Sequence, residues 1–214
     1  METRTKEAIR YLGYGSRAVD DKTLALVLES FGELDQVAEK RIIYRIFRFT
    51  APGADLIEID HLKIHSKNLS RNLKDCQEVV LLGATLGIQT DRLLERYSYT
   101  DMARTVVLQA CAAAILEEYL DSWQERLRTQ MEACGYYLRP RFSPGYGDFS
   151  IGHQGEILRM LDSAKRIGLS MTDGNMLTPT KSVTAVIGLG KNKTACPSGG
   201  CESCEKNDCL YRRG

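Results

Sequence analysis

The sequence lacks three features that would assign it to a common functional class. Its 29 Lys and Arg face 28 Asp and Glu, so 214 residues carry a net charge of only +1. A sequence-independent nucleic-acid binder needs an excess of cations to displace counterions, so we expect no nucleic-acid partner. No apolar run approaches roughly 18 residues, so we expect no membrane span. The charged residues 1–7 contain no apolar signal segment, which favours a cytoplasmic protein.

Familiar catalytic signatures are also missing from the chain. It contains neither the Gly-x-Ser-x-Gly of serine hydrolases nor the His-Glu-x-x-His of zinc peptidases. We find no internal repeat. Function must therefore be sought in less common combinations of residues.

Hydrophobic periodicity predicts an α+β fold. Helical and strand patterns are interspersed without a regular βαβ alternation, which favours a mainly antiparallel sheet packed by long helices, in one domain over about residues 1–190. Ser66 is a candidate N-cap. Helices are predicted at 3–12, 20–31, 66–73 and 150–167, and strands at 41–49, 56–64, 79–82 and 182–189.

The longest predicted element is a helix between Thr100, a candidate N-cap, and Gly135, a candidate stop. Apolar residues recur in it every three or four positions, the period of one helical face. We predict that these residues pack against the rest of the fold. They are Met102, Val106, Ala110, Ala113, Leu116, Leu120, Trp123, Leu127 and Met131.

Residues 191–214 differ in composition from the body. Apart from cysteines, their only apolar residues are Ala195, Leu210 and Tyr211, too few to offset the entropy of ordering. Four cysteines crowd into this tail, at spacings of x4, x2 and x4, and in a reducing compartment such clusters bind metal more often than they form disulfides. We interpret the tail as a zinc or iron–sulfur site, with unligated thiols as the alternative. Its ligands would be Cys196, Cys201, Cys204 and Cys209.

The proline-containing loop Arg141-Phe-Ser-Pro-Gly-Tyr146 is the most informative segment of the body. Arg141 could clamp a carboxylate in bidentate fashion, Gly145 permits close approach of the backbone to a ligand, and Tyr146 could lie against a cation. These groups suit a ligand with an amino-acid end and a positive centre. An ordinary structural turn explains the same residues equally well on physical grounds.

This loop, followed by a helix and then Lys181-Ser-Val-Thr-Ala185, resembles the S-adenosylmethionine-binding activation domain of cobalamin-dependent methionine synthase. The Gly-rich turn and alanine-rich helix of residues 83–120 are similar to that domain as well. The resemblance covers roughly residues 75–190. It implies an activation-domain fold in a stand-alone form.

The resemblance also implies a function. In that family S-adenosylmethionine remethylates a cobalamin that has oxidised, while an electron donor such as flavodoxin or ferredoxin reduces the cobalt. By carry-over, Arg141 would hold the methionine carboxylate, Ser143 and Gly145 would offer backbone groups, Tyr146 would lie near the sulfonium, and Glu118 would meet the amino group. The chain would then be a component of methyltransferase reactivation.

Two departures from the family pattern leave alternatives open. Ile187 aligns with a ligand-side tyrosine of the family, and the cysteine tail has no counterpart in the multidomain enzyme. Because no Asp-x-His-x-x-Gly cobalamin segment is present, the partner would be the cobalamin-binding domain of methionine synthase or another corrinoid protein. The alternative functions are an iron–sulfur electron-transfer protein for a corrinoid partner and a non-catalytic docking module with a structural zinc tail.

Overall fold

The structure, a computed structural model, describes residues 3–14 and 18–192. The predicted metal ligands Cys196, Cys201, Cys204 and Cys209 lie outside the described residues, so the metal site stays a prediction. The helices are α1 (Thr3–Tyr11), α2 (Asp21–Val37), α3 (Lys67–Asn72), α4 (Ile88–Ser98), α5 (Met102–Ala133), α6 (Gln154–Leu161) and α7 (Ser163–Ile167), with a short 3-10 turn η1 (Ile151–His153). The strands are β1 (Arg41–Thr50), β2 (Leu56–Ile59), β3 (Leu62–His65), β4 (Cys76–Thr85), β5 (Tyr137–Leu138), β6 (Ser170–Met171), β7 (Leu177–Thr178) and β8 (Ser182–Gly190).

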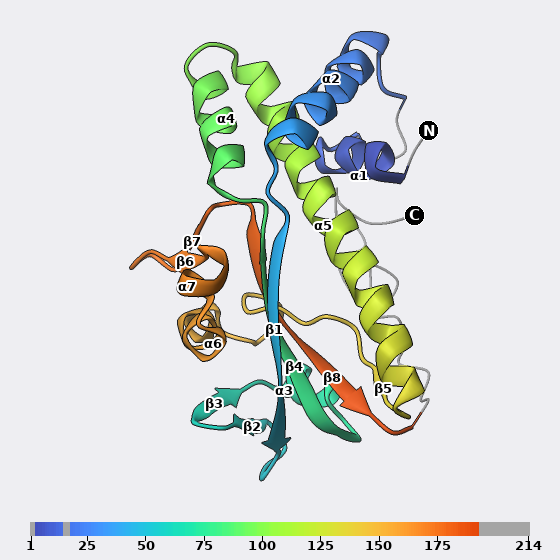
Figure 1. The fold of residues 1–214 in the computed structure, drawn as a ribbon, viewed down its shortest axis with the longest axis vertical. Coiled ribbons are helices and arrows are strands. Elements are labelled where there is room, and N and C mark those ends of the chain that lie inside the picture. The colour runs from blue at the N-terminus through green and yellow to red at the C-terminus, as the bar shows by residue number, and fades with distance from the viewer. Residues whose placement is uncertain (1–2, 15–17, 193–214) are drawn as a thin grey trace.

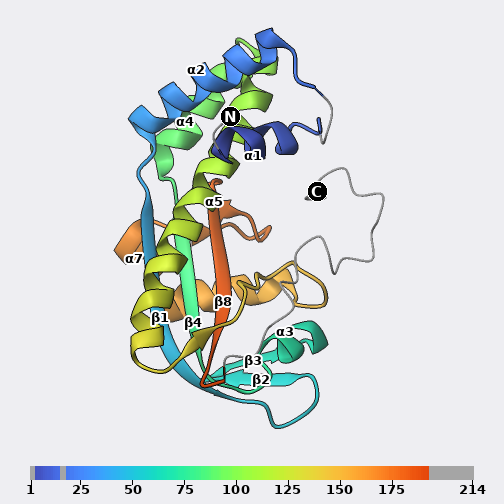
Figure 2. The same ribbon diagram turned by 90° about the vertical axis from the view of Figure 1, so that its right-hand side faces the viewer.

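Six of these strands form one antiparallel sheet in the order β3-β2-β1-β4-β8-β5, which confirms the predicted α+β class. Helix α5 lies on one side of the sheet and α6 and α7 lie on the other (Figure 1). Helices α1, α2 and α4 gather at one end, and α3 lies with the β2–β3 hairpin at the opposite end (Figure 2). None of the described helices combines the length and apolar character needed to cross a bilayer.

Strands β4 and β8 form the centre of the sheet and are buried on both faces. Side chains alternate between the faces of a strand, so an uninterrupted apolar run needs cover on both sides. Val80, Leu82 and Ile187 pack in the core beneath α5, whereas Leu81 and Val186 pack in the core beneath α6. The two apolar strands therefore account for the helices on either side of the sheet.

The extent of helix α5 was predicted correctly, but the set of its side chains that are buried was predicted only in part. Its C-terminal half buries Leu120, Trp123 and Leu127, as the periodicity indicated. At the other end, Met102 and Val106 are 66% and 53% exposed. The N-terminal half buries the predicted Ala110 and Leu116, and in addition it buries Leu108, Cys111, Ala112 and Ile115, because α1, α2 and α4 cover it together with the sheet.

Three predicted boundaries are wrong for local reasons. The predicted strand 56–64 is the β2–β3 hairpin, turned at Asp60, whose φ of 53° reverses the chain without breaking the polar–apolar alternation. The predicted helix 150–167 is divided at Asp162, whose φ is 54°. The N-cap of α5 is Asp101, which accepts from the Arg104 N–H at 3.0 Å, and not Thr100.

Strand β4 also continues past the predicted stop at Gly83 to Thr85, because Gly83 pairs with Ile43 and Thr184 inside the sheet. Other features were predicted correctly. Ser66 caps α3 by accepting the Leu69 N–H at 3.0 Å, and Gly135, with a φ of 76°, follows the end of α5.

We predict that Leu81→Ala lowers the free energy of unfolding by about 2–5 kcal/mol, because the truncation leaves a cavity beneath α6. Leu28→Ala is the matched control: Leu28 is 55% exposed on α2, and its truncation should change stability by no more than about 0.5 kcal/mol. Urea denaturation of both variants measures the difference. Equal losses would contradict a core centred on β4.

Candidate functional site

The loop that carries Arg141 runs along the outer edge of β8. Phe142 and Val186 exchange two backbone hydrogen bonds, of 2.9 and 2.8 Å, and the Arg139 N–H donates to the Gly188 carbonyl at 2.8 Å. Beyond Phe142, residues 182–185 of β8 have no strand partner on this side within the described part of the chain. The loop therefore ends the pairing of β8 halfway along its outer edge.

After Phe142 the chain forms a compact turn, which contains the rest of the motif Arg141-Phe-Ser-Pro-Gly-Tyr146. The Gly145 N–H donates to the Phe149 carbonyl at 2.7 Å, and the Tyr146 N–H donates to the Ser143 carbonyl at 3.1 Å. Gly145 has a φ of 95°, a conformation that side-chain-bearing residues rarely adopt. The Tyr146 ring is 69% exposed at the tip of the turn. Two of the backbone groups that were expected to face a ligand thus stabilise the loop itself.

Asp148 fixes this turn to the start of α3. Its carboxylate accepts the Ser66 hydroxyl at 2.5 Å and the backbone N–H groups of Lys67 and Asn68 at 2.7 and 3.2 Å. The hydrogen bond from Ser66 is the main cause that lowers the pKa of Asp148, and the backbone donors at the helix N-terminus act in the same direction. No local pattern in the sequence indicates this contact.

The beginning of the loop is held at the other end of the same helix. Arg139 donates through Nη2 to the Lys74 carbonyl at 3.1 Å, and Asn72 donates to the Pro140 carbonyl at 3.4 Å. The loop is thus anchored at both ends of α3. The segment between these anchors carries Arg141 toward α5.

Arg141 makes three contacts with one face of α5. Its Nη1 donates to Gln124 Oε1 at 2.8 Å, and its Nη2 donates to Glu117 Oε2 at 3.0 Å and to Asp121 Oδ1 at 2.7 Å. Steps of four and three residues along a helix bring these acceptors onto the same side. Three of the five guanidinium N–H donors are occupied, and two remain for another acceptor.

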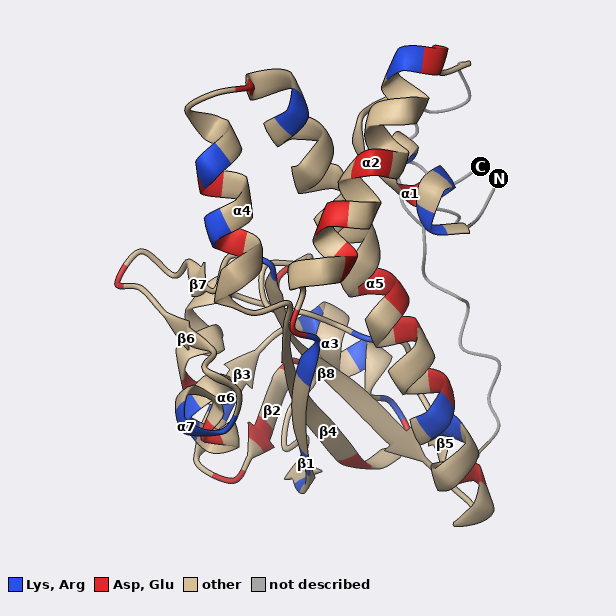
Figure 3. Cartoon of the chain, turned by 45° about the horizontal axis from the view of Figure 1, so that its top comes forward, with Lys and Arg blue, Asp and Glu red and all other residues tan. Residues whose placement is uncertain are grey.

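The local charge at this contact is negative. One guanidinium faces two carboxylates, and acidic residues recur along α5 and α2 (Figure 3). A group that carries positive charge is therefore complementary to this surface of α5. The spacing of residues 117, 121 and 124 was a signal in the sequence that a helical wheel would have revealed.

The remaining candidate residues are not gathered at this contact. Glu118 is exposed on α5 and lies about 100° around the helix from Glu117, so it belongs to a different face. Ile187 is completely buried in the core beneath α5. Lys181 immediately precedes β8. Its ammonium donates to the backbone carbonyl of Gln109 at 3.2 Å and to the side-chain oxygen of Gln109 at 2.8 Å. Burial lowers the pKa of Lys181.

A metal centre within the body is not indicated. In residues 3–14 and 18–192, no three His, Cys, Asp or Glu side chains are grouped so that they could hold a metal ion. The described cysteines are Cys76, Cys111 and Cys134. Burial raises the pKa of Cys111 to about 12, so that thiol is protonated at neutral pH.

We predict that Asp148→Ala changes how the stability of the protein depends on pH. A carboxylate whose folded pKa lies below its unfolded value of about 3.9 stabilises the folded state above that value, and this stabilisation is lost as the pH falls through the lower, folded pKa. The variant should be less stable than the native protein at neutral pH, and the difference should shrink in acid. Urea midpoints of both proteins at several pH values measure this. A constant difference would contradict the role of the charge.

Comparison with known proteins identifies the fold. No family model matches the chain, and no curated protein sequence matches it. Among solved structures it is similar to the MetH reactivation domain bound to AdoHcy (S-adenosylhomocysteine), with a TM-score of 0.61 and 15% sequence identity over 91% of this chain and 78% of that chain. At this identity the similarity establishes the fold alone. The chain therefore has the fold of the methionine synthase reactivation domain, as the sequence resemblance implied.

Proposed function

We propose that this chain is an S-adenosylmethionine-binding module that supports the reductive reactivation of a cobalamin held outside these 214 residues. The observation that carries the proposal is the contact of the Arg141 loop with the acidic face of α5, on the fold of a domain that binds S-adenosylhomocysteine. The cobalamin would belong to methionine synthase or another corrinoid protein. Flavodoxin or ferredoxin would serve as the electron donor.

The charges at the contact match this ligand. S-adenosylmethionine carries a carboxylate, an ammonium and a sulfonium, so its net charge is positive. Arg141 has two N–H donors left for the carboxylate, while Glu117 and Asp121 are acceptors for the ammonium. The exposed ring of Tyr146 offers a face to the sulfonium. Ser143 and Gly145 keep one backbone N–H and one carbonyl beyond those used in the loop.

The reaction follows from the chemistry of the ligand. The cobalamin of the partner would take up one electron from the donor protein and would then accept the methyl group of S-adenosylmethionine. S-adenosylhomocysteine, the ligand of the similar solved structure, is the other product. The role of this chain is to hold the methyl donor in a fixed orientation toward the cobalamin partner.

A second function is favoured by the four tail cysteines, which lie outside the described residues. An iron–sulfur cluster there would make the chain an electron-transfer protein for the same corrinoid partner, whereas zinc would indicate a structural docking tail. Anaerobic purification, a visible spectrum and metal analysis distinguish the two. Iron with acid-labile sulfide supports the first and zinc supports the second.

Binding itself is tested by isothermal titration of the full chain with S-adenosylmethionine and S-adenosylhomocysteine. We expect both ligands to bind, and ATP, which shares the adenosine but lacks the amino-acid end, to bind much more weakly. No heat of binding at millimolar S-adenosylmethionine would refute the proposal.

We predict that Arg141→Ala weakens S-adenosylmethionine binding roughly ten- to a hundred-fold, since a charge-assisted contact contributes about 1.5–3 kcal/mol. Arg128→Ala is the matched control, because Arg128 pairs with Glu125 on the same helix but lies outside the contact. Tyr146→Phe should cost less than Arg141→Ala, since the ring remains. Equal affinities of the Arg141 and Arg128 variants would show that the loop does not bind the ligand.

A second pair of variants tests which carboxylate meets the ammonium. We predict that Glu117→Gln weakens binding and that Glu118→Gln leaves it nearly unchanged, because only Glu117 contacts Arg141. Titration of both variants measures the difference. A larger loss for Glu118→Gln would instead support the sequence-based assignment of Glu118 and would require α5 to present another face.

A further inference from the structure

The outer edge of β1 is unpaired over most of its length. On its inner side, residues 41–48 pair one by one with β4. On its outer side, β2 pairs only with Phe49 and Thr50. Within the described part of the chain, no strand or isolated bridge pairs with the outer edge of residues 41–48. The backbone N–H and C=O groups that alternate residues direct outward from this edge are therefore available to a further strand.

The helices leave this edge uncovered. Helix α5 lies on one side of β1 and α6 with α7 lies on the other, while β1 itself runs along the margin of the sheet (Figures 1 and 2). Tyr44 and Ile46 are 40% and 41% exposed, whereas residues 79–85 of the neighbouring β4 are all buried. The strand therefore packs through its faces and presents its edge to solvent.

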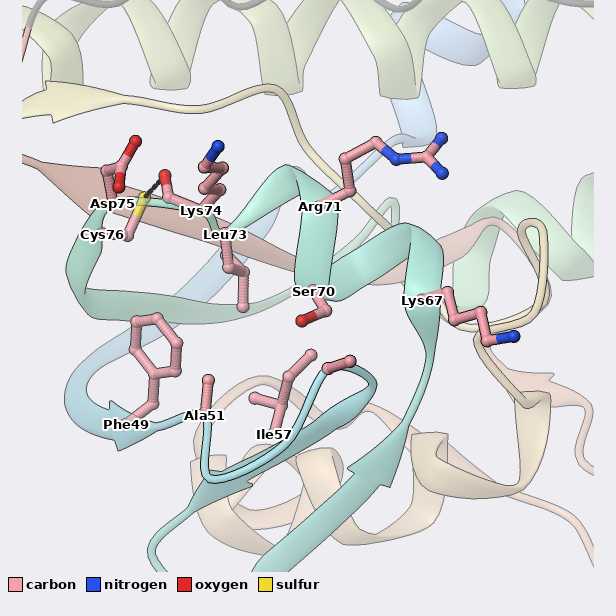
Figure 4. Close-up of a pocket in the computed structure, with 11 residues that line it drawn as sticks. Phe49, Ala51, Ile57, Lys67, Ser70, Arg71, Leu73, Lys74, Asp75 and Cys76 are labelled. Carbon is pink, nitrogen blue, oxygen red and sulfur yellow. Dashed lines mark hydrogen bonds between the residues drawn. The ribbon is translucent and has the colours of Figure 1, made fainter.

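The unpaired stretch ends where the β2–β3 hairpin begins. Phe49 pairs with Ile59, and its side chain lines a cavity of about 570 Å³ together with Ile57 and Leu73 (Figure 4). The hairpin thus occupies only the last two residues of β1. The eight residues before them span about 26 Å, which is the length of a complete strand.

The side chains of this stretch are apolar or cationic. Residues 41–48 contain three arginines and no carboxylate. Arg41 pairs with Glu39, and Arg45 donates to a backbone carbonyl of α6 at 3.1 Å. Arg48 is exposed and has no hydrogen-bond or ion-pair partner in residues 3–14 and 18–192. Only one of the three charges is therefore neutralised by a carboxylate.

Helix α7 brings further positive charge to the same margin. It packs beside β1, and a Cβ atom at Gly168 would lie 3.9 Å from Nη1 of Arg41. Lys165 and Arg166 are exposed on α7, and Asp162 pairs with Arg166 at 3.7 Å. The outer edge of β8, by contrast, lies beside the carboxylates of α5. Opposite margins of the sheet thus differ in charge, although the net charge of the chain is only +1.

These charges favour a strand from another protein over a second copy of this chain. Pairing of two β1 edges would place six arginines and no carboxylate in one ladder, and like charges on neighbouring strands destabilise a pair. A strand that carries carboxylates would pair its charges with Arg45 and Arg48 instead. The arginines therefore oppose self-association and select a complementary segment.

We propose that the outer edge of residues 41–48 is a docking site for an extended, carboxylate-bearing segment of another protein, which adds a strand to the sheet. The ladder of backbone hydrogen bonds supplies affinity, and the arginines select for acidic side chains. This edge is separated from the Arg141 loop by β4 and β8, so a docked segment leaves the candidate ligand site open. The docking does not depend on S-adenosylmethionine binding, and either proposal can fail alone.

The test uses labelled peptides of about eight residues, the length of the unpaired edge. One peptide alternates glutamate with valine, and its control alternates lysine with valine. By fluorescence anisotropy we expect the glutamate peptide to bind the full, reduced chain about tenfold more tightly than the control, and to slow amide hydrogen exchange in residues 41–48. No binding of the glutamate peptide at millimolar concentration, or equal binding of the two peptides, would overturn the proposal.

A third peptide separates strand addition from attraction between charges. A proline at the centre of the glutamate peptide keeps its charge but interrupts the ladder, because proline lacks the N–H donor. We expect this peptide to bind about tenfold more weakly than the uninterrupted one. If the proline peptide binds equally well, the edge does not pair with it and the proposal fails.

Two variants of the chain locate the binding. Arg48→Glu should weaken binding of the glutamate peptide about tenfold, because an attraction across the ladder becomes a repulsion. Lys22→Glu changes the net charge equally at an exposed position in the first turn of α2, and should alter binding by no more than about twofold. Circular dichroism checks that both variants fold. Equal losses in the two folded variants would show that net charge, and not the β1 edge, attracts the peptide.

Sedimentation of the chain without peptide tests the competing occupant. We expect the outer edge of β1 to remain open, so that amide exchange in residues 41–48 does not depend on protein concentration. A dimer in which these amides become protected as the concentration rises would show that a second copy occupies the edge, and would overturn the proposal.

Discussion

The architecture depends on one constraint, the burial of β4 and β8 on both faces. Val80, Leu82 and Ile187 on one face and Leu81 and Val186 on the other are removed from water only if helices cover both sides of the pair. Helix α5 covers one face and α6 with α7 covers the other, while β1 protects the outer edge of β4. The outer edge of β8 is the remaining edge of this central pair, and the Arg141 loop pairs with it through Phe142. The candidate site forms there for that reason.

The Arg141 loop is held by polar anchors that lie on different elements. Asp148 and Arg139 hold it to the two ends of α3, Phe142 pairs with β8, and Arg141 reaches α5. Each of these contacts fixes a different part of the loop, so the path of its backbone does not depend on a single side chain. The guanidinium is consequently presented to its carboxylate partners by the backbone around it, which reduces the entropy that a ligand would otherwise lose in ordering the loop.

The sequence predicted what depends on local pattern and failed where tertiary contacts decide. The long helix, the buried strands and the turn at Gly145 follow from apolar period, β-branched content and glycine, and the structure contains each of them. The hairpin at Asp60 was missed because alternation continues through a two-residue turn. Glu117 and Glu118 are adjacent in sequence, and only the packing of α5 shows that Glu117 faces Arg141, while the assignment of Glu118 to the amino group of a ligand stays a prediction. The exposure of Met102 likewise follows from helices that no local pattern could place.

Helix α3 is the support to which the Arg141 loop is anchored. A helix of six residues has little stability of its own in water, so its position is determined by what holds it. Asp148 satisfies the N–H groups at its start, and the Arg139 guanidinium binds the carbonyl of Lys74 beyond its end. The loop and the helix therefore hold each other in place, because each supplies polar partners for the other: the loop satisfies groups at both ends of α3, and α3 fixes both ends of the loop.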